Sequence, residues 1–262
     1  MRSRVTGVPL VGCAAVLAVV PALVSCGSNT DSSPPAPHVG TTMDRPLPAD
    51  VAALPLRDAS GHRVPLASLA GKTVVISDSM TLCSEDCPLD TANVTAAIRS
   101  TDRAGLTGDV EFLTITVDPR RDDSRHLEAY RKLYDPHDAL SNWRLLTGTP
   151  AQLARLWKFF GVYWHRVSPD RPPDHDWLTG RPLTYDVEHD DAVLVLDPQG
   201  HERLVITGHA HVADRSAVPG RMRSFLSPAG HRHLDRPDAA TWTTADVVQA
   251  VGWMTGHRIP SP

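Results

Sequence analysis

The sequence predicts an α/β sandwich, in which helices flank a mixed central sheet. Three observations lead to this fold class. Short β-branched runs alternate with amphipathic stretches, a strand-turn-strand pattern follows them, and a last helix closes the chain. The 262 residues are 41% hydrophobic and 21% charged, which suits one globular domain with appendages.

The N-terminal residues are expected to lie outside the fold. Arg2 and Arg4 precede an apolar run over 5–24, which ends in the Leu-Val-Ser-Cys sequence at Cys26. This order is typical of a secretory signal, and its last four residues resemble a bacterial lipobox. Residues 1–25 are therefore predicted to be a lipoprotein signal peptide, with Cys26 lipidated. The alternative is an uncleaved membrane helix. Either arrangement places the rest of the chain outside the cytoplasm, on the cell membrane.

Residues 26–48 are rich in Ser, Pro, Thr and Gly and predict a flexible linker. The domain is expected over 49–257. It opens with a predicted β-hairpin, whose strands at 54–57 and 63–66 flank a turn at Gly61.

The remaining elements follow from hydrophobic period and capping residues. Central strands are expected at 73–77, 110–117 and 143–146, and helices at 90–103, 122–134, 149–160 and 244–254. Thr149 and Pro150 supply an N-cap and a first helical residue. A hairpin is expected over 192–206. The segments 168–184 and 213–240 do not follow this alternation of strands and helices and are interpreted as surface excursions. The order of elements is that of a thioredoxin-like fold.

Composition and motifs exclude several functions. The formal net charge is −4, so the composition does not indicate a basic, nucleic-acid-binding protein. We find no Ser-His-Asp order, phosphate loop or dinucleotide fingerprint, so hydrolase and nucleotide-binding functions lack support.

The domain contains two cysteines, Cys83 and Cys87, placed between a predicted strand and a helix. Four residues apart, their thiols can face the same way. The helix N-terminus is expected to stabilise the thiolates and lower both thiol pKa values. Thiolates suit Cu(I) or disulfide chemistry. A plain structural disulfide remains an alternative, although so short a loop gains only about 2 kcal/mol. A structural zinc site would need more Cys and His ligands.

Four motifs in this order resemble the Sco/SenC family. They are the Cys-x-x-x-Cys-Pro element at 83–88, Asp-Pro-Arg-Arg-Asp at 118–122, Phe-Gly-Val-Tyr at 160–163, and Tyr-Asp-Val-Glu-His-Asp at 185–190. Together they span about residues 54–206. The chain departs from the family's pattern at Ser84, where Pro is usual, at 77–80, where aromatic residues and Gly are usual, and at Asp190, where Ser is usual.

The resemblance implies a copper ion, Cu(I) or Cu(II), held by Cys83, Cys87 and His189. It implies a metallochaperone that delivers copper, or reducing equivalents, to the CuA centre of cytochrome c oxidase or to another extracytoplasmic cuproprotein. Asp118 is expected to support docking or ligand orientation. The alternative is a membrane-tethered thiol-disulfide oxidoreductase that forms a redox disulfide between Cys83 and Cys87. A peroxidase would need a further cysteine.

The other candidate ligands are interpreted as ordinary residues. His209, His211, His231 and His233 are expected to be solvated loop residues, and Met80 a packing residue.

Overall fold

The computed structural model describes residues 1, 7, 33–169, 172–236 and 242–260. Nearly all of the predicted signal peptide, with Cys26, lies outside the described residues. Within the described part of the chain, no helix is long and apolar enough to cross a membrane.

The centre of the fold is a seven-stranded mixed sheet with the strand order β1-β9-β8-β3-β4-β5-β2. Its members are β1 (Thr41–Pro46), β2 (Arg57–Asp58), β3 (Thr73–Ser79), β4 (Val110–Thr116), β5 (Trp143–Thr147), β8 (Ala192–Leu196) and β9 (His201–Thr207). β3, β4 and β5 are parallel, and the other pairings are antiparallel. Every residue of β3 and β4 is buried, as expected of parallel strands covered on both faces.

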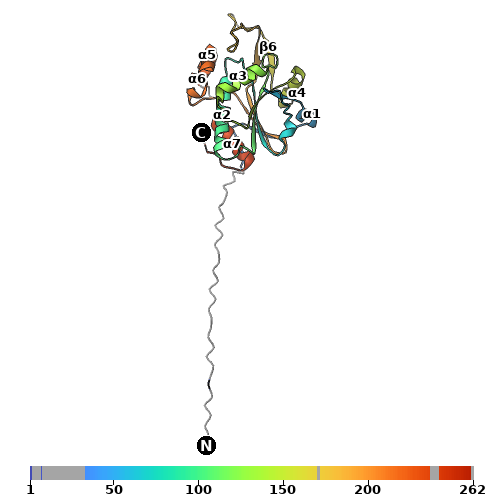
Figure 1. The fold of residues 1–262 in the computed structure, drawn as a ribbon, viewed down its shortest axis with the longest axis vertical. Coiled ribbons are helices and arrows are strands. Elements are labelled where there is room, and N and C mark those ends of the chain that lie inside the picture. Colours follow the sequence, from blue (N-terminus) through green and yellow to red (C-terminus); the bar gives the residue numbers. More distant parts are fainter. Residues whose placement is uncertain (2–6, 8–32, 170–171, 237–241, 261–262) are drawn as a thin grey trace.

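Helices cover both faces of this sheet (Figure 1). One face packs against α2 (Cys87–Arg103), α3 (Ser124–Tyr134) and α7 (Thr244–Thr255), and the other against α1 (Ala49–Ala52) and α4 (Pro150–Phe160). The predicted caps are present: Thr149 forms a capping box at the start of α4, and Thr243 forms one at the start of α7. The predicted α/β class with a mixed sheet is confirmed.

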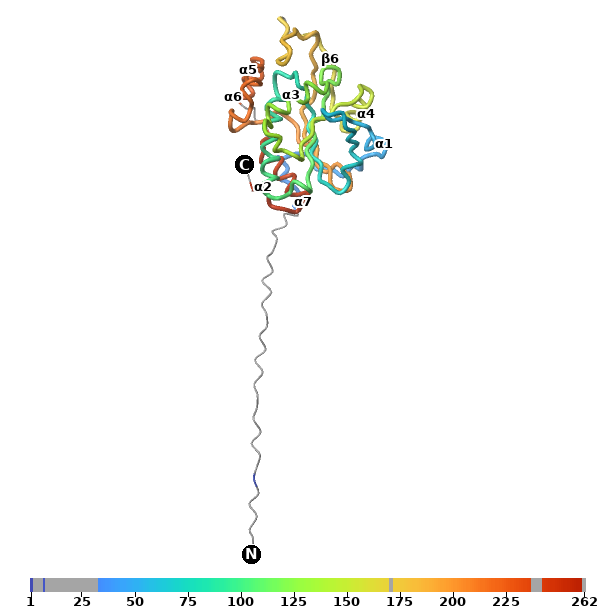
Figure 2. Tube along the Cα trace, viewed as in Figure 1, coloured from blue at the N-terminus to red at the C-terminus, as the bar shows by residue number. Residues whose placement is uncertain are grey.

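Several elements were not expected from the sequence. A separate hairpin consists of β6 (Trp164–Val167) and β7 (Asp186–His189). Short 3₁₀ helices lie at Leu66–Leu69 and Arg215–Ala217. Two further helices, α5 (Gly220–Phe225) and α6 (Pro228–Asp235), lie on the same side of the molecule as α2 (Figure 2).

Two predictions near the start of the domain are corrected. β1 lies within the predicted linker, because pairing with β9 and the ion pair from Arg45 to the buried Glu202 hold it at the sheet edge. The predicted N-terminal hairpin is reduced to a Gly61 turn and one antiparallel bridge from Arg57 to Arg63. Its first strand, β2, instead pairs with β5.

Candidate metal centre

The cysteine loop joins the end of β3 to the start of α2. Cys87 is the first residue of α2, and Pro88 follows it where a missing N–H costs nothing. The Cys83 N–H donates to the Met80 carbonyl at 3.3 Å, which closes the loop. Cys87 has no exposed surface and Cys83 is 6% exposed. Both are free thiols.

His189 is the last residue of β7, and the β6–β7 hairpin holds it beside the thiols. It pairs in register with Trp164. The turn after α4 sets the position of β6, because Gly161 has a φ of 76°, which favours glycine. Beyond His189, the Tyr163 N–H donates to the Asp190 carboxylate at 2.9 Å, and the Asp190 N–H donates to the Tyr163 carbonyl at 3.0 Å. The motif at 160–163 therefore helps to position the motif at 185–190, which contains His189.

Asp78 fixes the orientation of the His189 ring. Its Oδ2 lies 2.7 Å from His189 Nδ1, and its Oδ1 accepts the Ala192 N–H at 2.8 Å. The Asp190 carbonyl also lies 2.8 Å from Nδ1. Two acceptors at Nδ1 keep a proton on that nitrogen and turn Nε2 toward the thiols. Although burial lowers it, the hydrogen bonds with Asp78 and Cys83 raise the pKa of His189 well above its ordinary value, so Nε2 must release its proton before it can bind a metal ion. Sequence reasoning missed Asp78 and noted it only as part of a departure from the family pattern.

The structure brings the three predicted ligand residues together. His189 Nε2 lies 3.3 Å from Cys87 Sγ, and the two sulfurs and a ring nitrogen all lie within 4.8 Å of one another. The His189 side chain is 5% exposed. Two thiol sulfurs with one imidazole form a soft donor set, which fits a copper ion.

The prediction that the helix N-terminus lowers both thiol pKa values is wrong for the metal-free protein. The hydrogen bond with Cys87, together with burial, raises the pKa of Cys83 well above its ordinary value. Burial raises the pKa of Cys87 to about 11, and the Asp191 and Asp90 carboxylates add to the rise. Full burial outweighs the positive end of the helix. The pair is therefore held as neutral thiols when no cation is bound.

Carboxylates crowd the polar side of the centre. Burial, opposed by His189 and aided by the charges of Asp78 and Asp86, raises the pKa of Asp191 to about 7. Burial and the charges of Asp191, Asp86 and Asp78 also raise the pKa of Asp90. Such a group of buried acids is short of positive charge, so a bound cation would stabilise it.

Asp118 contacts Tyr185, the residue that precedes the strand carrying His189. It is 2% exposed and forms an ion pair with Arg121, and it accepts a hydrogen bond from the Tyr185 hydroxyl at 2.9 Å. The Arg121 guanidinium donates to the Tyr185 carbonyl at 2.8 Å and lies over its ring. Tyr185 precedes β7, so this cluster anchors the strand that carries His189. Met80 is 4% exposed and packs in the core, as predicted.

The two predicted surface excursions contact the cysteine loop. From the first, Trp177 donates to the Thr81 carbonyl at 2.6 Å, and Asp174 accepts from the Ser84 hydroxyl at 3.2 Å. From the second, the Ser227 N–H donates to the Ser84 carbonyl at 2.8 Å. Both segments therefore hold the cysteine loop in place, and their interpretation as mere surface insertions is wrong.

The prediction that His209 and His233 are solvated loop residues is wrong in part, because both side chains pair with Asp86 and His233 lies in α6. His209 Nδ1 lies 2.9 Å from one Asp86 oxygen, and His233 Nδ1 lies 2.7 Å from the other. Local sequence could not reveal this, because Asp86 lies more than a hundred residues earlier. His231 is exposed, as expected.

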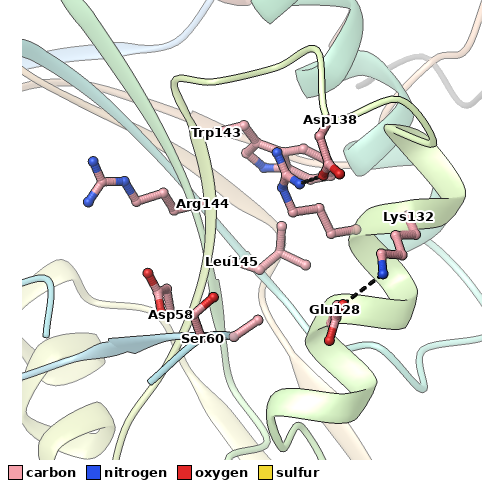
Figure 3. Close-up of a pocket in the computed structure, with 10 residues that line it drawn as sticks. Asp58, Ser60, Glu128, Lys132, Asp138, Trp143, Arg144 and Leu145 are labelled. Atoms are coloured by element: carbon pink, nitrogen blue, oxygen red, sulfur yellow. Dashed lines mark hydrogen bonds and ion pairs between the residues drawn. The ribbon is translucent and has the colours of Figure 1, made fainter. Parts of the chain in front are cut away.

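One pocket reaches the metal centre, and another does not. The first has a volume of about 480 Å³ and is lined by His189, Asp190, Asp191 and the 160–162 turn, among others. The second has a volume of about 400 Å³ and lies between α3, β5 and the turn after β2 (Figure 3). Its wall includes the Lys132–Glu128 pair at 2.7 Å and contains none of the three ligand residues. Of these two pockets, the first is the one that His189 lines.

Comparisons with known proteins find relatives of this chain in both sequence and fold. The SCO1/SenC family profile matches residues 50–218. A mitochondrial SCO2 homolog from Danio rerio is 28% identical over 145 residues, which are 55% of this chain and 47% of that protein. The chain thus spans about half the length of the curated relatives it matches.

Two solved structures are also similar. The apo Sco1 protein from Thermus thermophilus covers 81% of this chain and 94% of its own, with 18% identity and a TM-score of 0.51. Copper-bound ScoI from Bradyrhizobium japonicum covers 71% of this chain and 99% of its own, with 22% identity and a TM-score of 0.47. The first of these likenesses supports the thioredoxin-like fold.

Proposed function

The chain belongs to the SCO1/SenC family, and we propose from this premise that it is a copper metallochaperone that binds its cargo with Cys83, Cys87 and His189. The observation that carries the proposal is the placement of both sulfurs and a His189 ring nitrogen within 4.8 Å of one another. His189 Nε2 lies 3.3 Å from Cys87 Sγ, and Asp78 holds Nδ1. The two thiolates suit Cu(I), and the imidazole adds the nitrogen that Cu(II) prefers.

Protons must leave as copper binds, because both thiols are protonated in the metal-free protein. The nearby carboxylates lower the electrostatic cost of bringing in the cation. The pocket beside His189 offers its approach, since Asp190 and Asp191 line its wall. The copper ion should therefore approach the centre from the side of the His189 imidazole.

We further propose a place in cytochrome c oxidase assembly, with the CuA-bearing subunit or another extracytoplasmic cuproprotein as recipient. Family membership supports this proposal. Anchoring by a lipid on Cys26 rests on the sequence alone and places the domain on the outer side of the cell membrane.

The burial of the thiols counts against the oxidoreductase alternative. A thiol-disulfide exchange enzyme attacks with an accessible thiolate. Cys87 has no exposed surface, and its pKa is raised to about 11. Both features oppose a nucleophilic role, whereas a bound copper ion would itself stabilise the thiolates that it needs as ligands.

Anaerobic copper titration of the full chain in detergent tests the proposal. In His189→Ala, the thiolate-to-copper charge-transfer band of the Cu(II) form should disappear, while Cys83 and Cys87 still oxidise to a disulfide. His201→Ala is the matched control, because His201 Nδ1 also lies beside a carboxylate, Asp44, at 2.6 Å. If His189→Ala binds both copper states as the parent does, the three-ligand site is wrong and the oxidoreductase becomes the better explanation.

A further inference from the structure

Asp86, His209 and His233 form a second cluster of metal-ligating side chains next to the thiol centre. They come from the cysteine loop, from the segment after β9, and from α6. His233 Nδ1 lies 2.7 Å from Asp86 Oδ1, His209 Nδ1 lies 2.9 Å from Asp86 Oδ2, and the two imidazole rings are 4.5 Å apart. One donor atom from each residue lies within 4.8 Å of the other two.

The contacts within this cluster leave one nitrogen unsatisfied. His209 Nδ1 is buried, yet among the described residues it has no hydrogen-bond partner, because the nearby Asp86 oxygen lies outside hydrogen-bonding alignment. Buried polar nitrogens normally have a partner. A cation between His209 and Asp86 would satisfy this nitrogen without moving the chain far.

The surroundings of the cluster favour positive charge. Asp191 Oδ2 lies 3.9 Å from His209 Nδ1, so this carboxylate lies between the cluster and His189. Asp90 is 5% exposed, and its Oδ1 has no hydrogen-bond partner among the described residues. The side chains of the cluster are only partly covered, at 39% exposure for His209 and 20% for His233, so an ion can reach it from solvent.

We propose that Asp86, His209 and His233 form an accessory site for a divalent transition metal. Two imidazoles and a carboxylate are borderline-to-hard donors, unlike the soft thiol pair, and they suit Cu(II) or Zn(II) rather than Cu(I). Cu(II) should bind more tightly than Zn(II), following the general affinity order of divalent metals. This site goes beyond the proposed chaperone function and does not depend on it.

The location of the site gives metal binding a structural consequence. Asp86 lies between the two cysteines, and His233 belongs to α6, which packs on the same loop. A bound ion would join the loop, the segment after β9 and α6 at one point. It should therefore stabilise the folded protein by mass action, because the ion binds the folded state.

The test uses the full chain in detergent, without an affinity tag, with Cys13, Cys26, Cys83 and Cys87 all replaced by serine. Removing the thiols eliminates the copper centre, so failure of the chaperone proposal cannot affect the result. The probes are Cu(II) and Zn(II), each supplied as a weak chelate. The readouts are bound metal per chain after gel filtration, nitrogen hyperfine structure in the Cu(II) spectrum, and the unfolding temperature.

We expect one bound Cu(II) per chain, a higher unfolding temperature with metal, and displacement of Zn(II) by Cu(II). Adding His209→Ala or His233→Ala should weaken binding by at least about tenfold, a scale typical of disrupted metal sites. His231→Ala is the matched control in α6, because His231 is exposed and outside the cluster. It should bind metal normally.

Two outcomes would overturn the proposal. One is a cysteine-free chain that binds neither ion while its far-ultraviolet spectrum stays that of the parent. The other is binding that survives His209→Ala and His233→Ala but is lost in His189→Ala. That result would assign the ion to the neighbouring Asp78, His189 and Asp191 side chains.

Discussion

Replacing Asp78 by asparagine tests how the protein prepares His189 for copper. The carboxylate accepts from two groups at once, the His189 Nδ1–H at 2.7 Å and the Ala192 N–H at 2.8 Å. Asparagine has almost the same shape but only one acceptor oxygen. Its NH₂ group must therefore face either the ring nitrogen or the backbone donor.

Both arrangements weaken the site. If the amide oxygen stays with Ala192, the NH₂ group faces His189 Nδ1 and favours the tautomer whose proton is on Nε2, where copper must bind. If the amide turns round, a buried backbone donor loses its acceptor, at a cost of about 1–3 kcal/mol. The change should reduce Cu(II) affinity by about 10–100-fold, the range found when the partner of a ligating histidine is removed. That range equals about 1.4–2.8 kcal/mol.

Competition against a chelator of known affinity measures the loss, and nitrogen NMR of His189 reports its tautomer. Cu(I) should be affected less, because two thiolates already suit it. Asp44→Asn is the matched control, since Asp44 pairs with His201 at the surface, and it should leave copper binding unchanged. An Asp78→Asn protein that is folded and binds Cu(II) as tightly as the parent would refute the orienting role of this carboxylate.

Four further outcomes are expected. Burial raises the pKa of Asp122 to about 6, above its unfolded value near 3.9. Because the folded state binds this proton more tightly, the parent protein loses stability as the pH rises between these two values. In urea unfolding, Asp122→Asn should therefore gain up to about 3 kcal/mol relative to the parent between pH 4 and pH 7, and a pH-independent difference would contradict this. Gly230→Ala should lose about 1–3 kcal/mol, because its Cβ would lie 2.4 Å from the Ser84 carbonyl oxygen. Gly220→Ala, which meets only the end of the Arg223 side chain at 3.8 Å, is its control, and equal stability of the two would refute the close packing of α6 on the loop. Asp118→Ala should keep near-full copper loading while transfer to a recipient slows, and complete copper loss from the folded variant would show a direct role in capture. Cys26→Ala should release the protein from the membrane or block maturation, and unchanged association and precursor size would count against the lipobox.

Local patterns predicted the parts of the fold that depend on hydrophobic period and capping. The runs that became β3 and β4 are buried on both faces, and the Thr149 cap begins α4 as expected. β1 could not be predicted in this way. Strand-favouring Thr41 and Thr42 are followed by Asp44 and Pro46, which disfavour strands, and the pairing of β1 with β9 requires a partner about 160 residues later.

In the candidate site, too, the features that depend on local sequence were predicted, and those that depend on distant contacts were not. Motif order was enough to select Cys83, Cys87 and His189, which the fold brings together. Asp78 was missed, and the acidity of Asp86 was noted without its histidine partners, because both contacts join side chains more than 100 residues apart. The thiol pKa values were predicted in the wrong direction, since the sequence reveals the helix N-terminus but not the complete burial that outweighs it.

The pocket beside His189 determines the side from which copper can leave the site. The two excursions hold the cysteine loop on one side, and Cys87 has no exposed surface, so a recipient cannot reach the sulfur pair from there. The pocket lined by His189, Asp190 and Asp191 leaves the imidazole side approachable. Transfer should therefore begin with exchange of the imidazole, because two thiolates can still hold Cu(I) after His189 leaves. A recipient that offers soft or imidazole ligands at this pocket would approach the ion from the side of the imidazole.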